Sequence, residues 1–332
     1  MADKRLLKLL VGVFVLLSAV SFVTPLIQPA QAAVIELKAV VVLPVRNIQI
    51  DGFKMFVNRI NEQLKGQVKI NILGGPEVIP PFELDEAVTK GVIDLCMDSS
   101  SFYSAMLPES EAVMFSNLPA LEARKIIYDK MVELHENVGL RYLGDTMRAP
   151  MVIYSNVPIK TPGDLKGKKI RVFPAIIPFV KSLGAIPVTM KMGDIYSAMD
   201  RGVVDGFVKS PYGIVKNDHF HEVTKYVIVH EFYAASMNVI MNLKKWNQIP
   251  KNLQDRIVEI NHEVYPEIVK HYDSILAGEW KEIFDNGIKP IKFSPGDVKT
   301  YLNKAYEEGW QRIIDKSPTT GPELKKMLFK KY

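Results

Sequence analysis

The chain contains one cysteine, Cys96, so no disulfide can form within it. Cys96 lies in the mostly apolar run Val92–Met97, and this position predicts a buried residue that packs as a small hydrophobe. A chain of 332 residues can bury a core that is stable without disulfides. For a secreted protein, this composition fits a bacterial periplasm.

The sequence also lacks the motifs that mark common catalytic and nucleotide-binding sites. It has no Gly-x-Ser-x-Gly elbow, no phosphate loop and no dinucleotide fingerprint. Its six histidines are scattered and predict no nucleophile–base pair. Adjacent carboxylates such as Asp85 and Glu86 point to different sides of a helix, which favours a solvated surface over an acid–base pair. We therefore expect neither an enzyme nor a bound cofactor.

One short segment has the composition of a metal site. His219 and His221 lie two positions apart, and Asp218 and Glu222 add carboxylates. Zinc sites need three or four ligands, and spacing places no further ligand here. A charged surface loop is the better interpretation, and we predict no metal site.

Long apolar runs are absent except at the N-terminus. Lys4 and Arg5 precede the apolar run Leu6–Val23, and Lys8 lies near its start. The small-residue segment Ala30–Ala33 comes after this run. This order is typical of a secretory signal peptide, with residues 1–32 removed by cleavage after Ala32. A membrane anchor is the alternative. Without this segment the net charge falls from +5 to about +3, which is too small to indicate nucleic-acid binding.

One pattern occurs twice in the chain. Residues 87–94 and 198–205 share an alanine, a glycine and an aspartate at the same spacing, with a basic residue before each glycine. The glycine suits the left-handed residue that closes a helix, and the apolar pair after it is expected to begin a buried strand. Two such units predict two similar α/β lobes with a ligand cleft between them. Coincidence is the alternative, because helix–glycine–strand turns are common.

Strand and helix patterns alternate in both halves of the chain. In the first half, strands at 34–43, 67–73 and 92–97 are separated by helices, an order typical of a doubly wound sheet. We expect strands at 141–143, 147–155, 226–229 and 234–242 to cross between the lobes. A long helical stretch at 252–284 is expected to be interrupted at Pro266.

Arginine is suited to binding a carboxylate because its planar guanidinium forms two parallel hydrogen bonds. Arg171 lies inside the apolar run Ile170–Phe173, where a buried charge needs a partner. An outward-facing strand residue explains Arg171 equally well. Arg148 follows the same logic more weakly at the start of its strand.

Several segments match one family in order along the chain: Asp164–Val172, Gly184–Val188, Asp194–Met199, Gly202–Gly206, Lys225–Tyr226, Asn242–Trp246, Gly75–Glu77 and Gly91–Asp94. As an ordered set, these segments resemble the solute-binding proteins of TRAP (tripartite ATP-independent periplasmic) transporters, a family that binds C4-dicarboxylates and other organic acids. The resemblance covers essentially all of the chain after the leader. It implies capture of a small organic acid in the periplasm and delivery to a membrane permease driven by a sodium gradient.

The resemblance also implies roles for particular residues. Arg171 matches the arginine that pairs with the ligand carboxylate, and Arg148 matches a second arginine. Ser210 stands before Pro211 where the family often has an asparagine, so the contact with the rest of the ligand differs here. The Gly75–Glu77 segment resembles the branch that binds 2-oxo and other monocarboxylates more than the sialic-acid branch. The full set of expected ligand-binding residues is Arg171, Arg148, Phe173, Ser210, Phe207, Asp98, Ser99, Tyr103, Glu77 and Asn47.

Aromatic side chains near these positions have two interpretations. Phe173, Phe207, Tyr212 and Tyr103 line an apolar cleft in one and pack in the core in the other. The sequence alone does not decide between them.

These observations and the resemblance predict an α/β, two-lobe periplasmic binding protein of the type II-like class. Each lobe is a sheet flanked by helices, and crossing strands and a long helix join the two. We expect lobe I at 33–146 plus about 236–275 and lobe II at 147–235 plus about 276–332. Expected partners are the organic acid and the TRAP permease subunits, with a homodimer possible. The alternatives are the binding protein of an ATP-driven importer and, less favoured, a secreted enzyme acting on an organic acid.

Overall fold

The computed structural model describes residues 33–330, and from Ile35 onward these residues form one compact unit. The predicted signal peptide, residues 1–32, lies outside the described residues. Within the described part of the chain, no helix is both long enough and apolar enough to cross a membrane.

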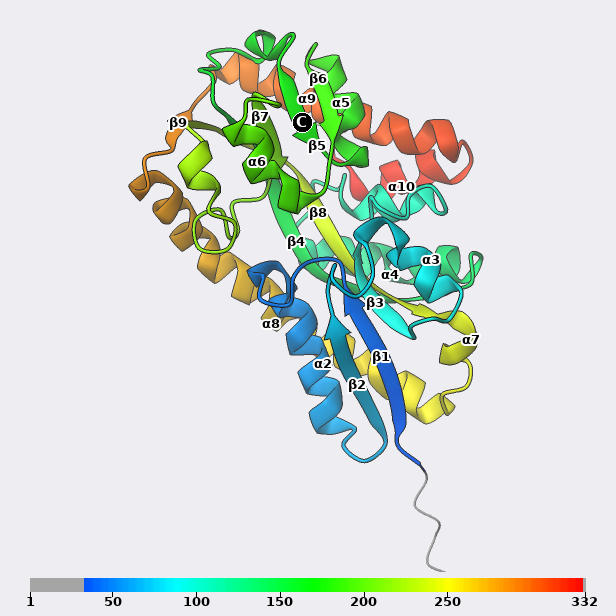
Figure 1. The fold of residues 1–332 in the computed structure, drawn as a ribbon. Helices are drawn as coiled ribbons and strands as arrows, with labels where there is room; N and C mark the ends of the chain where they lie inside the picture. The colour runs from blue at the N-terminus through cyan, green and yellow to red at the C-terminus, as the bar shows by residue number, and fades with distance from the viewer. Residues whose placement is uncertain (1–32, 331–332) are drawn as a thin grey trace, which may run out of the picture. The chain divides into compact units, whose positions relative to one another are not determined.

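Nine strands of the described residues form one mixed sheet in the order β2-β1-β3-β8-β4-β7-β5-β6, with β9 paired to β8 (Figure 1). Three parallel strands lie on one side of the sheet, and three more lie on the other. Their bounds are Ile35–Val41 (β1), Val68–Gly74 (β2), Leu95–Ser99 (β3), Lys169–Val172 (β5), Ile186–Thr189 (β6), Gly206–Lys209 (β7) and Lys289–Ile291 (β9). We use lobe I for the half with β2-β1-β3 and lobe II for the half with β7-β5-β6.

Two long antiparallel strands, β4 (Leu140–Ser155) and β8 (Tyr226–Asn242), belong to both halves. One part of β8 pairs with β3, and the last part of β4 pairs with β7. The predicted crossing is therefore present, but each strand runs continuously where two short strands were expected. The register of β4 shifts at Gly144, whose φ of 109° suits glycine, so the expected break is a bulge within one strand.

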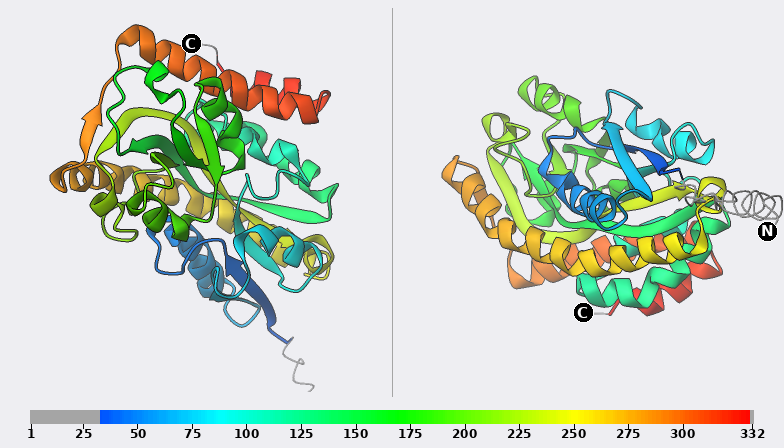
Figure 2. Two further views of the ribbon diagram at one scale, coloured as in Figure 1. Left: turned by 45° about the horizontal axis from the view of Figure 1, so that its top comes forward. Right: turned by 90° about the horizontal axis from the view of Figure 1, so that it is seen from below.

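Helices cover both faces of the sheet. Helices α4, α8 and α9 pack on β4 or β8, whereas α2 packs on β2 and α3 on β3 (Figure 2). The helix bounds are Asp51–Gln63 (α2), Leu84–Thr89 (α3), Ala120–Glu136 (α4), Ile177–Ser182 (α5), Ile195–Asp200 (α6), Leu243–Trp246 (α7), Lys251–Asp285 (α8), Pro295–Lys316 (α9) and Thr320–Leu328 (α10).

Helix α8 runs through Pro266 without a break, so the predicted interruption is wrong. An internal proline removes one helical hydrogen bond and costs about 3 kcal/mol. The helix packs against β4, α2 and α4, and Tyr265 and Ile268 beside the proline are buried. This packing offsets the lost hydrogen bond, which the local sequence cannot show.

The repeated segment forms the same structure in both lobes. Gly91 and Gly202 both have positive φ after a helix end, as predicted. The carboxylate of each following aspartate accepts a hydrogen bond from the backbone N–H of a lysine in a neighbouring strand. The backbone N–H of the same aspartate donates to the carbonyl oxygen of that lysine. Asp94 binds Lys38 of β1 in this way, and Asp205 binds Lys169 of β5. The strand begins after the aspartate rather than at the apolar pair, whose first residue is exposed in both copies.

The lobe boundaries given above remain a proposal, with one change. Helix α10 packs against α9, and also against α4 and the 3-10 helix Pro108–Val113, the last two within the first 146 residues. We therefore propose that α10 belongs with lobe I, although residues 276–332 were assigned to lobe II. Leu324 and Leu328 of α10 are fully buried in this packing.

The core contains Cys96 and two of the aromatic residues considered above. Cys96 is fully buried, as predicted, and burial raises the pKa of its thiol well above the usual value. Phe207 stacks on Tyr154 with ring centroids 4.8 Å apart, in a cluster of buried side chains within lobe II. Tyr212 is buried against Tyr272 of α8. The core interpretation is therefore the correct one for Phe207 and Tyr212.

A buried chain of hydrogen bonds joins α4 and β8 to Tyr103, which lies in the segment after β3. The amide of Asn238 donates to the Tyr103 hydroxyl at 2.5 Å, and this hydroxyl lies 3.1 Å from Nε2 of His135. Nδ1 of His135 lies 2.6 Å from the carbonyl oxygen of Met131, which assigns the proton to Nδ1. Burial of the ring lowers the pKa of His135 to about 4.

We predict that His135 makes the protein acid-sensitive between pH 6.5 and 4. In this range the unfolded chain binds a proton at His135 and the folded chain does not, so stability falls as the pH falls, by up to about 3 kcal/mol. His135→Gln should remove this part of the pH dependence, measured by urea unfolding at several pH values. Equal pH dependence in the variant and the parent protein would show that His135 is not responsible.

Candidate functional site

A small cavity lies where the carboxyl ends of strands from both lobes meet, and we call it the deep cavity. Its volume is about 90 Å³. Val42 and Ser99 contribute from the ends of β1 and β3, and Arg171 and Ser210 contribute from β5 and the end of β7. Ligands of doubly wound sheets bind at this edge. The other lining residues are Leu43, Gln49, Pro81, Phe82, Phe102, Met151, Phe173, Lys191, Met192, Val208, Lys209, Ala235 and Met237.

Arg171 is a buried cation that lines this cavity. Its Nε and Nη2 donate to the carbonyl oxygen of Met190 at 3.1 and 2.9 Å, and Nη1 donates to the carbonyl oxygen of Val208 at 3.4 Å. Only 5% of the residue is exposed, and burial lowers the pKa of Arg171 to about 10, so it stays charged at neutral pH. None of the ion pairs within residues 33–330 includes it. The alternative of an outward-facing residue is therefore wrong.

A second buried cation, Lys209, is already neutralised. Its Nζ lies 3.0 Å from Oδ2 of Asp218 and also donates to the carbonyl oxygen of Tyr212. Lys191 also lines the cavity, but it is exposed. Arg171 is therefore the one buried cation of the described cavity lining without a carboxylate partner.

Hydrogen bonds connect the two lobes around the cavity. Nε2 of Gln49, in the segment after β1, donates to the Ser210 hydroxyl at 2.9 Å. Elsewhere the Ala175 amide donates to the Ser101 hydroxyl at 3.0 Å, and the Asn217 amide donates to the Arg46 carbonyl oxygen at 3.4 Å. In this structure the lobes are therefore closed over the deep cavity.

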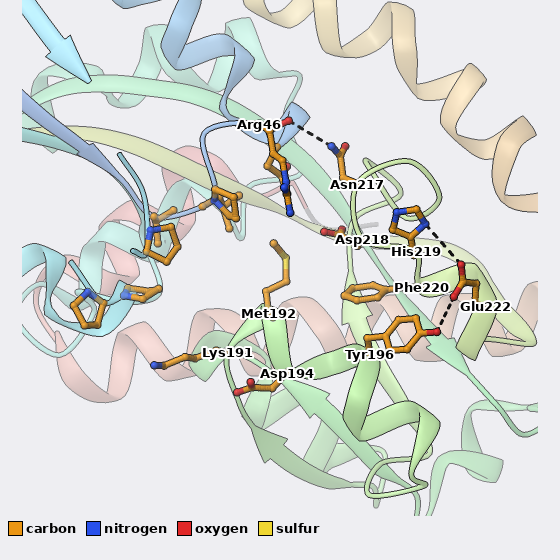
Figure 3. A pocket seen from close by; sticks show the side chains of 18 residues that line it. Arg46, Lys191, Met192, Asp194, Tyr196, Asn217, Asp218, His219, Phe220 and Glu222 are labelled. Carbon is orange, nitrogen blue, oxygen red and sulfur yellow. Dashed lines mark hydrogen bonds and ion pairs between the residues drawn. The ribbon is translucent and has the colours of Figure 1, made fainter. Parts of the chain in front are cut away.

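A wider pocket of about 730 Å³, here called the mouth, shares Val42, Leu43, Pro81, Lys191 and Met192 with the deep cavity. The shared residues make the mouth the route to the deep cavity from solvent. Figure 3 shows Arg46 and Met192 pointing toward one another across this pocket.

The two histidines considered as a metal pair lie in the loop beside the mouth. His219 lines the mouth with Glu222, and the Tyr196 hydroxyl donates to Glu222 at 2.6 Å (Figure 3). Among the described residues, no group of three or more His, Cys, Asp or Glu side chains is arranged to hold a metal ion.

Five of the ten expected ligand-binding residues line these two pockets. Arg171, Phe173, Ser210 and Ser99 line the deep cavity, and Asn47 lines the mouth. Asn47 also accepts a hydrogen bond from the Gln49 amide at 2.9 Å, which helps to position Gln49. Contact of these five residues with a ligand remains a prediction.

The other five line neither pocket. Arg148 donates to carbonyl oxygens before α4 and faces α8, so it lies on the other side of β4 and does not join Arg171. Phe207 and Tyr103 belong to the core, as described above. Asp98 is buried, and burial raises the pKa of its carboxyl well above the usual value. Glu77 is exposed and accepts from the Gly75 amide, which lowers the pKa of its carboxyl.

Several lining residues were not predicted from the sequence. Gln49 and Met192 lie in segments that follow strands, and that position could have indicated a place near the ligand. Phe82 follows a pair of prolines. Met151 and Met237 lie inside the long strands, where alternation alone does not distinguish a cavity-facing residue from a core residue.

The fold is shared by solved structures of bacterial binding proteins. A TRAP periplasmic solute-binding protein from Desulfovibrio salexigens with bound orotic acid superposes with a TM-score of 0.81 and 22% identity, over 88% of this chain and 97% of that one. An extracytoplasmic solute receptor from Bordetella pertussis that binds pyroglutamic acid gives a TM-score of 0.79 and 16% identity, over 89% and 99% of the two chains. The α/β, two-lobe fold class is therefore confirmed.

Curated relatives have related names. A 2,3-diketo-L-gulonate-binding periplasmic protein from Escherichia coli is 26% identical, over 71% of this chain and 73% of its own length. A monocarboxylate 2-oxoacid-binding periplasmic protein from Nostoc is 24% identical, over 73% and 70%. Another relative, an uncharacterized Haemophilus influenzae protein, is 29% identical, and the match spans 43% of its length.

The family comparison covers most of the chain. Residues 39–317 match the model of DctP, the bacterial extracellular solute-binding protein family 7. The predicted resemblance to TRAP solute-binding proteins is thereby confirmed, and members of this family are periplasmic receptors rather than enzymes. These comparisons do not support a homodimer, which the sequence left open. The chain belongs to the DctP family of bacterial extracellular solute-binding proteins.

Proposed function

We propose that the protein captures a small organic acid in the periplasm and delivers it to the membrane subunits of a TRAP transporter. The observation that carries this proposal is Arg171, a buried cation that lines a cavity, donates hydrogen bonds only to carbonyl oxygens and interacts with the carboxylate of Asp194 only at longer range. A buried charge without a counter-charge is costly, so a carboxylate in the cavity would relieve this cost. Two of the relatives and both solved structures described above carry a carboxylic acid in their names, which agrees with this chemistry.

The cavity supports binding rather than turnover. Its described lining includes no histidine, cysteine or carboxylate, the usual general bases and nucleophiles of an enzyme. Lys209 is held in an ion pair with Asp218. A secreted enzyme is therefore less favoured, and the family match disfavours the binding protein of an ATP-driven importer.

The proposed mechanism is closure of the two lobes over the acid. Arg171 binds the carboxylate from lobe II, and Ser99 and Gln49 approach from lobe I. This replaces the earlier expectation that Arg148 and Asp98 take part, because neither lines the cavity. The acid favours the closed form because it contacts both lobes only there, and exclusion of water strengthens the ion pair. Residues 1–32 would direct export.

Arg171→Met should weaken binding of an organic acid at least about 30-fold, because it removes a buried charged hydrogen-bond pair. Binding is measured by calorimetry, with an acid first identified by thermal-shift screening. Arg148→Met is the matched control and should leave affinity unchanged, since Arg148 lies on the other side of β4. Full affinity in a folded Arg171→Met protein would overturn the proposed carboxylate site.

Gln49→Ala should weaken the same binding about fivefold, because the closed form loses one hydrogen bond between the lobes. Small-angle X-ray scattering at a half-saturating concentration of the acid should show a larger radius of gyration for the variant than for the parent protein. Unchanged affinity and unchanged scattering would show that this bond does not contribute to closure.

A further inference from the structure

The deep cavity is mainly apolar outside its arginine. Phe82 and Phe102 lie together on the side of lobe I, with ring centroids 4.7 Å apart, and Phe173 lines the cavity from lobe II. Met151, Met192 and Met237 add flexible apolar surface. Phe82 is 43% exposed in this structure, a large apolar surface that a bound apolar group would cover.

The polar groups of the cavity are few and partly occupied. Gln49, Ser99 and Ser210 are the uncharged polar side chains of the described lining, and Gln49 already donates to Ser210. A sugar acid carries more hydroxyl groups than these three residues can satisfy. Each buried hydroxyl without a partner is unfavourable, so the lining selects against sugar acids.

The charges of the cavity favour one carboxylate. Among the described residues Arg171 forms no ion pair at contact distance and has only a longer-range interaction with Asp194, whereas Lys209 is paired with Asp218. A second carboxylate would have only exposed cations available, Lys191 at the boundary with the mouth and Arg46 in the mouth. Exposed ion pairs contribute little, so they do not compensate for the dehydration of a second carboxylate.

The size of the cavity limits the ligand further. The deep cavity without the mouth has a volume of about 90 Å³, smaller than the roughly 150 Å³ apolar cavity that holds benzene, so the part of the ligand inside it is small. We propose that the ligand is a monocarboxylate whose tail is a short apolar chain of about two to four carbons, rather than a dicarboxylate, a sugar acid or an aryl acid. This inference rests on the proposed function and identifies the substrate class of the same site.

A homologous series of acids tests this inference. Acetate, propionate, butyrate and pentanoate are titrated by calorimetry into protein that has been unfolded and refolded to remove any retained ligand. Each added methylene should tighten binding about fourfold until the cavity is full. Succinate and glucuronate should bind at least tenfold more weakly than butyrate, and benzoate should bind more weakly as well.

Two alanines on neighbouring positions of β8 provide a matched pair of variants. Ala235 lines the deep cavity, whereas Ala234 lines a hollow on the other side of the strand. Ala235→Leu should fill most of the cavity. It should lower the affinity for pentanoate more than the affinity for acetate. Ala234→Leu adds the same side chain outside the cavity and should leave the whole series unchanged.

The outcomes separate this inference from the function on which it rests. Tightest binding of succinate, glucuronate or benzoate, lost in Arg171→Met, would overturn the apolar-tail inference and leave the carboxylate receptor standing. Loss of dicarboxylate binding in Lys191→Met would show that Lys191 supplies the second cation. Failure of every acid to bind the refolded protein would overturn both proposals.

Discussion

The antiparallel pairing of β4 with β8 is the interaction on which the rest of the structure depends. These strands are the continuous part of the sheet, and each set of three parallel strands is attached to one of them. Because parallel strands end at the same edge, the pairing brings the carboxyl ends of β1 and β3 opposite those of β5 and β7. The deep cavity forms at this junction, so its position follows from topology rather than from a local motif.

Arg171 has a stable position without a ligand because the backbone holds it. The carbonyl oxygens of Met190 and Val208 fix the guanidinium on strand ends of lobe II, and burial keeps water away from it. Carbonyl dipoles reduce the cost of the buried charge, but they do not neutralise it. The protein therefore keeps a preorganised cation whose remaining electrostatic cost an anion can relieve, which favours affinity without a large conformational penalty in the side chain.

The sequence was sufficient for some of these features and not for others. The repeat around Gly91 and Gly202 predicted two similar lobes because its glycines and aspartates have local backbone roles. Arg148 was misplaced because alternation along a strand does not report which face covers a cavity, least of all where bulges shift the register. Pro266 was misread because tertiary packing along α8 outweighs the local cost.

The proposed closure depends on a small balance of free energies. The hydrogen bonds between Gln49 and Ser210, and between Ala175 and Ser101, each contribute only about 1 kcal/mol net, because water replaces them in an open form. A shift from mostly open to mostly closed needs a differential affinity of about 5.5 kcal/mol. A buried Arg171–carboxylate pair contributes about 2–5 kcal/mol, and burial of a few methylene groups adds about 0.8 kcal/mol each. Neither part alone reliably reaches the required value, so the proposed mechanism favours an acid that has both a carboxylate and an apolar tail.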